Sequence, residues 1–297
     1  MGRWSLDGKV ILITGGAAGI GAATARELAG RGAIPVLADL DPEGLARTAS
    51  TIGGDPLTVE IDVTDLASCE TAVEAAVERH GAVDAVWANA GIASFGPVAL
   101  TDPAAWKRTL DVNVAGVFNT VRAALPSVME RRGYVAVSAS VASFAHAPFM
   151  SAYCTTKAGV EAFANALRLE VAHRGVEVAT IHPSWIKTPM VVEGESELSA
   201  FDHLKGSLNY PLSKTYPVER AAKDIANGFE RRKRRICTPG WVRALAIGRA
   251  ALTTRVAERD FRKVAPEVES LYTAEMEREG ATAASMTGRV KEQVPHA

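Results

Sequence analysis

Tyr153 and Lys157 lie four residues apart in the stretch Ser151-Ala-Tyr-Cys-Thr-Thr-Lys157. On an α-helix, residues i and i+4 lie one above the other on the same face. A positive charge beside a phenol favours the phenolate, so this spacing predicts a tyrosine with a lowered pKa that exchanges a proton with an alcohol or carbonyl oxygen. The same spacing also arises by chance on solvated helices, so the rest of the chain must decide between the two interpretations.

A glycine-rich turn separates a predicted strand from a predicted helix. Residues 9–14 form an apolar, β-branched run typical of a buried parallel strand. Gly15, Gly19, Ile20 and Gly21 follow, and a helical pattern then continues to about residue 31. Glycines at such a turn let the backbone approach a diphosphate, and the helix N-terminus offers free N–H groups to the anion. The alternative is a glycine-rich turn that serves only to pack the helix against the strand, but the strand–turn–helix context favours dinucleotide binding.

The next predicted strand, residues 34–39, ends in Asp39, about 20 residues after the glycines. A carboxylate at this position can accept hydrogen bonds from the adenosine ribose hydroxyls and repels a 2′-phosphate. Residues 15–21 contain no Arg or Lys that would attract that phosphate. We therefore expect NAD rather than NADP. Capping of the following helix is the alternative role for Asp39, although Asp41 is available for it as well.

Strand and helix patterns alternate along the chain. Further strands are predicted at 57–62, 83–88, 134–138, 176–182 and 235–238, and helices at 103–131, 151–173 and 218–232. Such alternation implies right-handed crossovers and a parallel sheet covered on both faces. We expect an α/β, doubly wound, Rossmann-type sheet of about seven strands. Ligands bind at the carboxyl ends of such strands, which is where Gly15, Asp39, Asp62 and Asn89 fall.

The composition sets outer limits on function. The chain has 297 residues and a net charge of -1, which gives no reason to expect nucleic-acid binding. Cys69, Cys154 and Cys237 lie far apart, a spacing that suits neither a zinc site nor a disulfide framework and fits a reducing compartment. Neither a signal-like region nor an apolar run of about 18 residues is present, so we expect a cytoplasmic protein without bound metal.

The motifs, taken together and in order, resemble the short-chain dehydrogenase/reductase family over about residues 5–240. The matching pieces are Thr14-Gly15-x-x-x-Gly19-Ile-Gly21, Asp62-Val63, Asn89-Ala90-Gly91, Asn113-Val114, Ser140, Tyr153-x-x-x-Lys157 and Pro183 through Thr188. One position departs from the family pattern, because Ser184 stands where a glycine usually follows the proline. A serine fits there only if the backbone φ is not positive.

The resemblance implies four catalytic residues. Tyr153 would be the general acid/base, and Lys157 would lower its pKa and hold the nicotinamide ribose. Ser140 would hydrogen-bond the substrate oxygen, and Ser138 and Ser143 are near alternatives in register. Asn113 would hold a water that relays protons from Lys157 to solvent.

The resemblance also implies a cofactor site. Asp62 and Val63 would flank the adenine, Asn89 would support the glycine loop, and Thr188 would contact the nicotinamide amide. The whole expected set is Gly15, Gly19, Ile20, Gly21, Asp39, Asp62, Val63, Asn89, Gly91, Tyr153, Lys157, Pro183 and Thr188.

These roles imply an NAD-dependent alcohol dehydrogenase or carbonyl reductase. The alternatives are the same chemistry with NADP(H), and a catalytically silent nucleotide-binding scaffold or sensor. Residues 184–216 are the predicted substrate loop, and Phe95, Phe144, Phe149 and Met150 are expected to approach it from the other side. This apolar lining favours a small apolar alcohol or ketone. By the resemblance, helices 103–131 and 151–173 imply a homodimer or homotetramer.

The chain continues beyond the Rossmann-type domain, residues 1–240, into a helical C-terminal extension, residues 241–297. An apolar stripe at helical spacing predicts a helix that packs on the domain or on a neighbouring subunit. The stripe consists of Trp241, Leu245, Gly248, Leu252 and Val256. The basic run 231–235 precedes it, so contact with an anionic membrane surface is a less favoured alternative. Weak order is expected from about residue 282.

Overall fold

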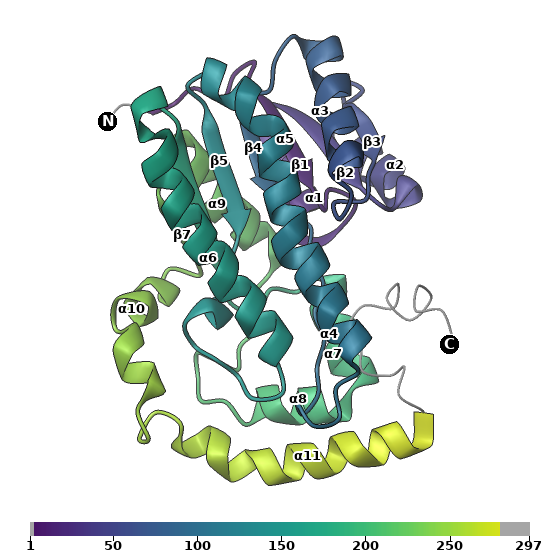
Figure 1. Ribbon diagram of the computed structural model, residues 1–297, viewed down its shortest axis with the longest axis vertical. Coiled ribbons are helices and arrows are strands. Elements are labelled where there is room, and N and C mark those ends of the chain that lie inside the picture. Colours follow the sequence, from purple (N-terminus) through teal and green to yellow (C-terminus); the bar gives the residue numbers. More distant parts are fainter. Residues whose placement is uncertain (1–2, 280–297) are drawn as a thin grey trace.

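A parallel seven-stranded sheet forms the centre of the computed structural model, which describes residues 3–279 (Figure 1). The strand order is β3-β2-β1-β4-β5-β6-β7, and every pairing is parallel. The strands are β1 (Val10–Thr14), β2 (Ile34–Asp39), β3 (Thr58–Glu60), β4 (Ala85–Ala88), β5 (Tyr134–Ser138), β6 (Glu177–Pro183) and β7 (Arg235–Thr238). The doubly wound architecture expected from the sequence is confirmed.

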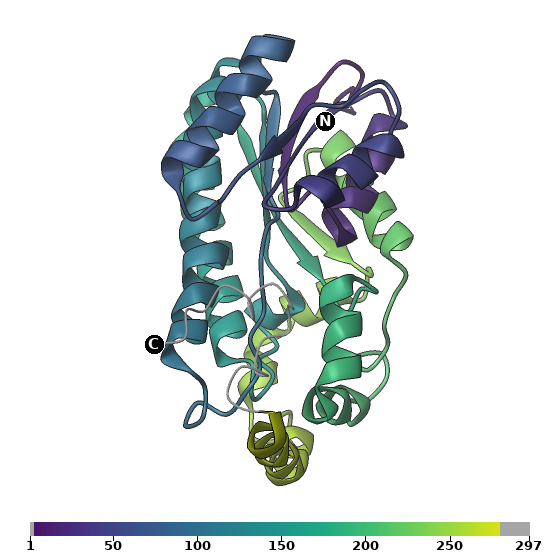
Figure 2. The same ribbon diagram turned by 90° about the vertical axis from the view of Figure 1, so that its right-hand side faces the viewer.

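Helices cover both faces of this sheet (Figure 2). One layer consists of α3 (Leu66–His80), α5 (Gly116–Glu130) and α6 (Ser151–Val171), and the other of α1 (Gly19–Ala29), α2 (Pro42–Ser50) and α9 (Val218–Glu230). Each layer buries an apolar core of its own against the sheet. Both faces of the strands are therefore apolar, which explains why strands such as β1 and β5 read as continuous hydrophobic runs.

The strand order reverses between β1 and β4, and this reversal positions the site. From β1 the chain winds outward to β2 and β3, and from β4 it winds in the opposite direction to β7. The loops that leave β1 and β4 therefore diverge and open a crevice at the carboxyl ends of the strands. Gly15 directly follows β1 and Asn89 directly follows β4, so both lie at this crevice.

The long helix expected at 103–131 is present and contains a π-helical turn. It consists of α4 (Pro103–Leu110), a π-helical turn (Asp111–Ala115) and α5. π turns insert one residue into a helix and are frequent at functional sites. Asn113 lies within this turn. The expected strand at 57–62 is also shorter, since only Thr58–Glu60 pairs with β2 at the edge of the sheet.

The C-terminal extension is helical, but the single helix expected from the apolar stripe is wrong. The stripe is divided between α10 (Val242–Ile247) and a 3₁₀ segment (Arg249–Thr253), and Val256 is 83% exposed. Trp241, Leu245 and Leu252 pack on the domain in a cluster around Phe144. The weak order expected from about residue 282 falls outside the described residues.

A long helix, α11 (Arg259–Glu279), lies across the base of the molecule beneath α8 (Ser199–Gly206) in both views (Figures 1 and 2). Together with α7 (Pro189–Glu197), α8 forms most of the predicted substrate loop. Val264, Val268 and Tyr272 on α11 are buried in the same apolar cluster as Phe201. Within residues 3–279, no helix has both the length and the hydrophobicity needed to span a membrane.

Candidate active site

The glycine turn after β1 adopts a conformation that requires its glycines. Gly15 has φ 68° and Gly19 has φ 55°, in the left-handed region that favours glycine. A Cβ on Gly21 would lie 2.1 Å from the Gly15 carbonyl oxygen, so only glycine permits this approach of helix α1 to the turn. The turn therefore presents bare backbone at the crevice, as binding of a diphosphate requires.

Asn89 fastens this turn to the central strands. Its Nδ2 donates to the carbonyl oxygens of Thr14 (3.0 Å) and Gly15 (3.2 Å). Its Oδ1 accepts from the Ser138 hydroxyl at 3.0 Å, and that hydroxyl accepts from Trp87 Nε1 at 3.0 Å. The ends of β1, β4 and β5 are thus joined by side-chain hydrogen bonds. The expected support of the glycine loop by Asn89 agrees with this geometry.

A cleft of about 520 Å³ runs along the carboxyl ends of β1, β2 and β3. The expected cofactor residues that line it are Gly15, Asp39, Asp62, Val63 and Gly91. Asp39 Oδ2 accepts from the Ala17 N–H at 3.0 Å, and Oδ1 accepts from the Asp41 N–H at 3.2 Å. Asp41 occupies the N-cap position of α2, so Asp39 is not the cap of that helix.

A second cavity, of about 250 Å³, continues from this cleft towards helix α6. It is lined by ten of the expected residues: Gly15, Gly19, Ile20, Asp39, Asn89, Gly91, Tyr153, Lys157, Pro183 and Thr188. Gly21 lies behind the lining, packed against Asn89. Residues from five strand ends therefore converge on one continuous crevice.

Helix α6 places Tyr153 and Lys157 on one face, as their spacing predicted. The Lys157 ammonium lies 5.4 Å from the centroid of the Tyr153 ring and donates to the Ser138 carbonyl oxygen at 2.9 Å. Burial lowers the pKa of Lys157 to about 8, because the charged ammonium is disfavoured away from water.

The pKa of Tyr153 moves in the opposite direction from the sequence-based expectation. Burial raises it to about 12, and hydrogen bonding by Ser140 only partly offsets this effect. Burial disfavours the phenolate more than the surrounding groups favour it. The protein alone therefore does not supply a tyrosine with a lowered pKa.

Ser140 lies at the end of β5, at the start of a short 3₁₀ turn (Val141–Ser143). Its hydroxyl accepts from the Ala142 N–H at 3.1 Å, and its N–H donates to the Ser143 hydroxyl at 3.2 Å. Ser140 lines a pocket of about 120 Å³ together with Tyr153, whereas Ser138 lines the cavity of about 250 Å³. Ser138 instead bonds to Asn89, and Ser143 faces α6, where its hydroxyl donates to the Lys157 carbonyl.

Asn113 is fully buried behind the crevice. Its Nδ2 donates to the Ile92 carbonyl (2.9 Å) and to the Thr156 hydroxyl (3.1 Å), and its Oδ1 accepts from the Ile92 N–H (2.8 Å). Both amide hydrogens are committed to protein partners. The amide hydrogens of Asn113 are therefore not free to hold a relay water.

A smaller pocket of about 120 Å³ adjoins Ser140 and Tyr153. Its walls are mostly apolar and include Met150, Trp185, Ile186, Met190 and Val191. Among the aromatic residues expected opposite the loop, Phe95 and Phe149 pack in the cluster beneath the pocket, and Phe144 faces α10. These three rings support the pocket and do not line it.

The serine that replaces the usual glycine is accommodated without strain. Ser184 is not among the described non-glycine residues with positive φ, and its N–H donates to the Thr238 carbonyl at 2.9 Å. The condition for a serine at this position is therefore met, and the loop leaves β6 in an ordinary conformation.

Residues 9–198 match the model of the family described as short chain dehydrogenase. The chain belongs to the short-chain dehydrogenase family. An uncharacterized oxidoreductase of Listeria innocua is 37% identical over 193 residues, which cover 63% of this chain and 78% of the relative. A 2,5-dichloro-2,5-cyclohexadiene-1,4-diol dehydrogenase of Sphingobium indicum is 38% identical over 190 residues, covering 62% and 76% of the two chains.

Solved structures of the family agree with this assignment. A short-chain dehydrogenase/reductase from Burkholderia phymatum in complex with NAD superimposes with a TM-score of 0.74 at 26% identity, covering 84% of this chain and 95% of that one. This short-chain dehydrogenase is accordingly an oxidoreductase that uses a nicotinamide dinucleotide. The crevice of this chain fits such a cofactor. A Cβ on Gly15 would lie 2.8 Å from Asn89 Nδ2, so the packing permits only glycine there and leaves the backbone exposed to a diphosphate.

Several residues of the short-chain dehydrogenase site were not expected from the sequence. Arg47, Arg108, Val112 and Glu193 also line the larger cleft. They come from helices or their ends, where side-chain direction depends on packing and leaves no local sequence signal.

Proposed function

We propose that this short-chain dehydrogenase oxidises an apolar secondary alcohol with NAD and reduces the matching ketone with NADH. The observation that carries the proposal is that Tyr153 lines two cavities. One is continuous with the cofactor cleft, and the other is the apolar pocket next to Ser140. A substrate oxygen held between Ser140 and Tyr153 would place its carbon at the junction of the two cavities.

In this proposal the protein handles the proton and the cofactor handles the electrons. When bound, the nicotinamide accepts or supplies the hydride. Tyr153 takes the hydroxyl proton during oxidation and returns it during reduction. Ser140 orients the substrate oxygen, and Lys157 holds the ribose while its charge favours the phenolate. Asn113 fixes the π turn, whose main-chain carbonyl would hold the relay water.

Asp39 supports NAD as the cofactor. Its carboxylate lines the cleft at the end of β2, where it would accept hydrogen bonds from a ribose diol and repel a 2′-phosphate. Asp62 and Val63 line the same cleft, next to the expected place of the adenine. Thr188 and Pro183 line the inner cavity, at the expected nicotinamide end.

The substrate class follows from the pocket. Its apolar walls and the hydroxyls of Ser140 and Tyr153 suit a compact molecule with one reacting oxygen. The Sphingobium relative, by its name, is a dehydrogenase of a ring diol. We therefore propose cyclic and other apolar secondary alcohols as the class. A homodimer or homotetramer through α5 and α6 is also proposed, because Phe118 and Leu169 are 48% and 80% exposed on these helices.

An activity screen tests the function. Cyclohexanol, substituted cyclohexanols and open-chain secondary alcohols are offered with NAD, and formation of NADH is followed by absorbance. Tyr153→Phe should lower kcat by about 100-fold or more while NAD still binds, because general acid–base catalysis is lost. Tyr210→Phe is the matched control, since Tyr210 is 77% exposed. Full activity of Tyr153→Phe would overturn the mechanism.

The alternative is a catalytically silent nucleotide-binding scaffold. The joint lining of the pocket by Ser140 and Tyr153 speaks against it, because nucleotide binding alone does not require a substrate pocket. Tight NAD binding without turnover of any alcohol or ketone in the screen would favour the scaffold.

A further inference from the structure

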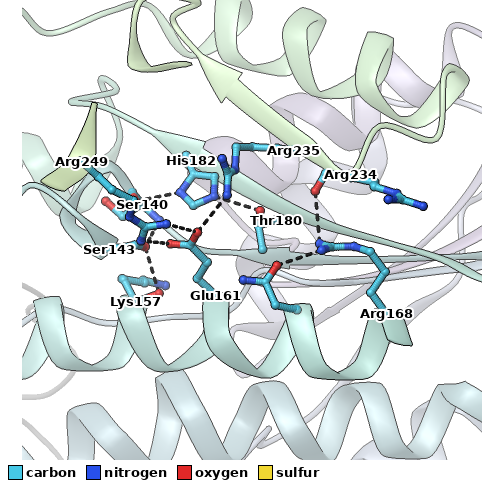
Figure 3. A network of polar contacts seen from close by, with 11 residues as sticks. Ser140, Ser143, Lys157, Glu161, Arg168, Thr180, His182, Arg234, Arg235 and Arg249 are labelled. Carbon is cyan, nitrogen blue, oxygen red and sulfur yellow. Dashed lines mark hydrogen bonds and ion pairs between the residues drawn. The ribbon is translucent and has the colours of Figure 1, made fainter. Parts of the chain in front are cut away.

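Arg249 of the C-terminal extension reaches the catalytic helix. Its Nη1 and Nη2 lie 2.9 Å and 3.0 Å from Oε1 and Oε2 of Glu161, a two-point pairing of guanidinium and carboxylate (Figure 3). Glu161 is four residues beyond Lys157 on α6 and is only 3% exposed. Arg235, at the start of β7, also contacts Glu161 Oε1 at 3.1 Å. The extension is therefore anchored one helical turn from a catalytic residue.

The same guanidinium also contacts the segment that carries Ser140. The Arg249 Cζ lies 5.3 Å from the centroid of the Phe144 ring, within the range of a cation–π contact. Phe144 is 3% exposed and directly follows the 3₁₀ turn that begins after Ser140. Arg249 thus bridges α6 and the Ser140 turn through Glu161 on one side and Phe144 on the other.

Two further side chains hold the Ser140 backbone within this bridge (Figure 3). The Ser143 hydroxyl accepts from the Ser140 N–H at 3.2 Å and donates to the Lys157 carbonyl at 2.9 Å. His182 Nδ1 lies 3.0 Å from the Ser140 carbonyl oxygen, and its Nε2 lies 2.9 Å from Thr180 Oγ1. Because a carbonyl only accepts, Nδ1 must carry the proton.

We propose that Arg249 is a positioning residue, which holds the Ser140 turn against helix α6 so that Ser140 and Tyr153 address the same substrate oxygen. This inference rests on the proposed function for its catalytic consequence. Ser140 and Tyr153 belong to different elements, a strand end and a helix, so their relative position depends on contacts between those elements. Arg249, Phe144 and Ser143 supply such contacts, and the extension thereby becomes part of the active-site framework.

Arg249→Met tests the proposal without leaving a bare buried charge, because Arg235 still pairs with Glu161 in the variant. Arg243→Met is the matched control, an exposed arginine in the same extension. Amide hydrogen exchange of the unliganded protein is measured by mass spectrometry. Arg249→Met should exchange at least about fivefold faster in the peptide 139–146, because the local opening free energy falls. Arg243→Met should match the wild type. An unchanged exchange rate in Arg249→Met would overturn the proposal that Arg249 holds the Ser140 turn.

Kinetics with NAD and the best alcohol from the screen test the catalytic consequence. Arg249→Met should lower kcat by about tenfold, because misplacement of a positioned group is costly. The KM for NAD should stay within about twofold, since the cofactor residues are untouched. In a Ser140→Ala background the same substitution should change kcat by less than about twofold, because Arg249 acts through Ser140. An equal loss of kcat on Arg249→Met substitution in the wild type and in Ser140→Ala would overturn the positioning role of Arg249.

The two proposals can fail separately. If the wild type turns over no alcohol or ketone, the proposed function fails, and the exchange measurement alone still decides whether Arg249 holds the Ser140 turn. If the wild type is active and Arg249→Met behaves like Arg243→Met in both assays, the positioning role fails and the proposed function stands.

Discussion

The Lys157 ammonium lies 5.4 Å from the centroid of the Tyr153 ring, and it donates to the Ser138 carbonyl oxygen at 2.9 Å. Burial lowers the pKa of Lys157 to about 8 and raises the pKa of Tyr153 to about 12. Both shifts have the same cause, which is that a charged group is poorly solvated in the interior. Burial therefore disfavours the charged form of both side chains, but near neutral pH only Lys157 is charged, so only its burial lowers the stability of the fold.

The first prediction concerns this cost. Below pH 8 the Lys157 ammonium is charged in both folded and unfolded states, and burial of the charge destabilises the fold by about 3 kcal/mol. Between pH 8 and the unfolded value of 10.5 the unfolded state binds more protons, so stability rises with pH and the penalty disappears.

Lys157→Met should therefore be inactive, but below pH 8 its unfolding free energy should be higher than that of the wild type. Its unfolding free energy relative to the wild type should fall by about 3 kcal/mol between pH 7 and pH 10.5, as the wild type loses its penalty. Urea unfolding at several pH values measures this difference, with Lys223→Met at an exposed site as the control. A difference that stays constant with pH would contradict the prediction.

The second prediction concerns the cofactor. Asp39→Asn keeps an oxygen that can accept from the Ala17 N–H but removes the negative charge. The ratio of NAD affinity to NADP affinity should fall by about tenfold, because a charged hydrogen bond to the ribose is weakened and repulsion of the 2′-phosphate is lost. Titration calorimetry with both dinucleotides measures the ratio.

The control for Asp39→Asn is Glu43→Gln on the exposed side of α2, which removes a nearby charge outside the cleft lining. An NAD preference that survives Asp39→Asn at the wild-type level would show that another group selects the cofactor.

The third prediction concerns α11. Glu275 is 3% exposed, and its Oε1 accepts from the N–H of Ser199 at 2.6 Å and from the Ser199 hydroxyl, at the start of α8. Glu275→Ala leaves these donors without their acceptor, so the unfolding free energy should fall by about 2 kcal/mol. The KM for the alcohol should rise, because α7 and α8 form one packed unit and α7 lines the substrate pocket through Met190 and Val191.

Urea unfolding and steady-state kinetics measure the two effects of Glu275→Ala, with the exposed Glu277→Ala as the control. Loss of stability without any change in KM would confine the role of α11 to the fold.

Much of the site can be predicted from local patterns. The spacing of Tyr153 and Lys157 indicates one helix face, and the glycines between strand and helix indicate a phosphate turn, because both features depend only on neighbouring residues. The alternation of strands and helices then determines the parallel sheet and brings Gly15, Asp39 and Asn89 to one edge.

Interactions between distant residues could not be predicted in this way. The side-chain amide of Asn113 donates to the Ile92 carbonyl and the Thr156 hydroxyl. The residues next to Asn113 in the sequence give no indication of these partners. The expected single helix through residues 241–256 was wrong because helical spacing of apolar residues does not show where the chain turns.

By itself, the sequence predicted the family and the fold, which are confirmed, and it indicated which residues are expected to transfer a proton. The tertiary structure established the environment of those residues: the raised pKa of Tyr153, the lowered pKa of Lys157, and the pairing of Arg249 with Glu161 across 88 residues of chain. The physical reason is that residue types and short spacings are local properties. Burial and long-range contacts exist only once the whole chain has packed, and they determine charge, position and stability.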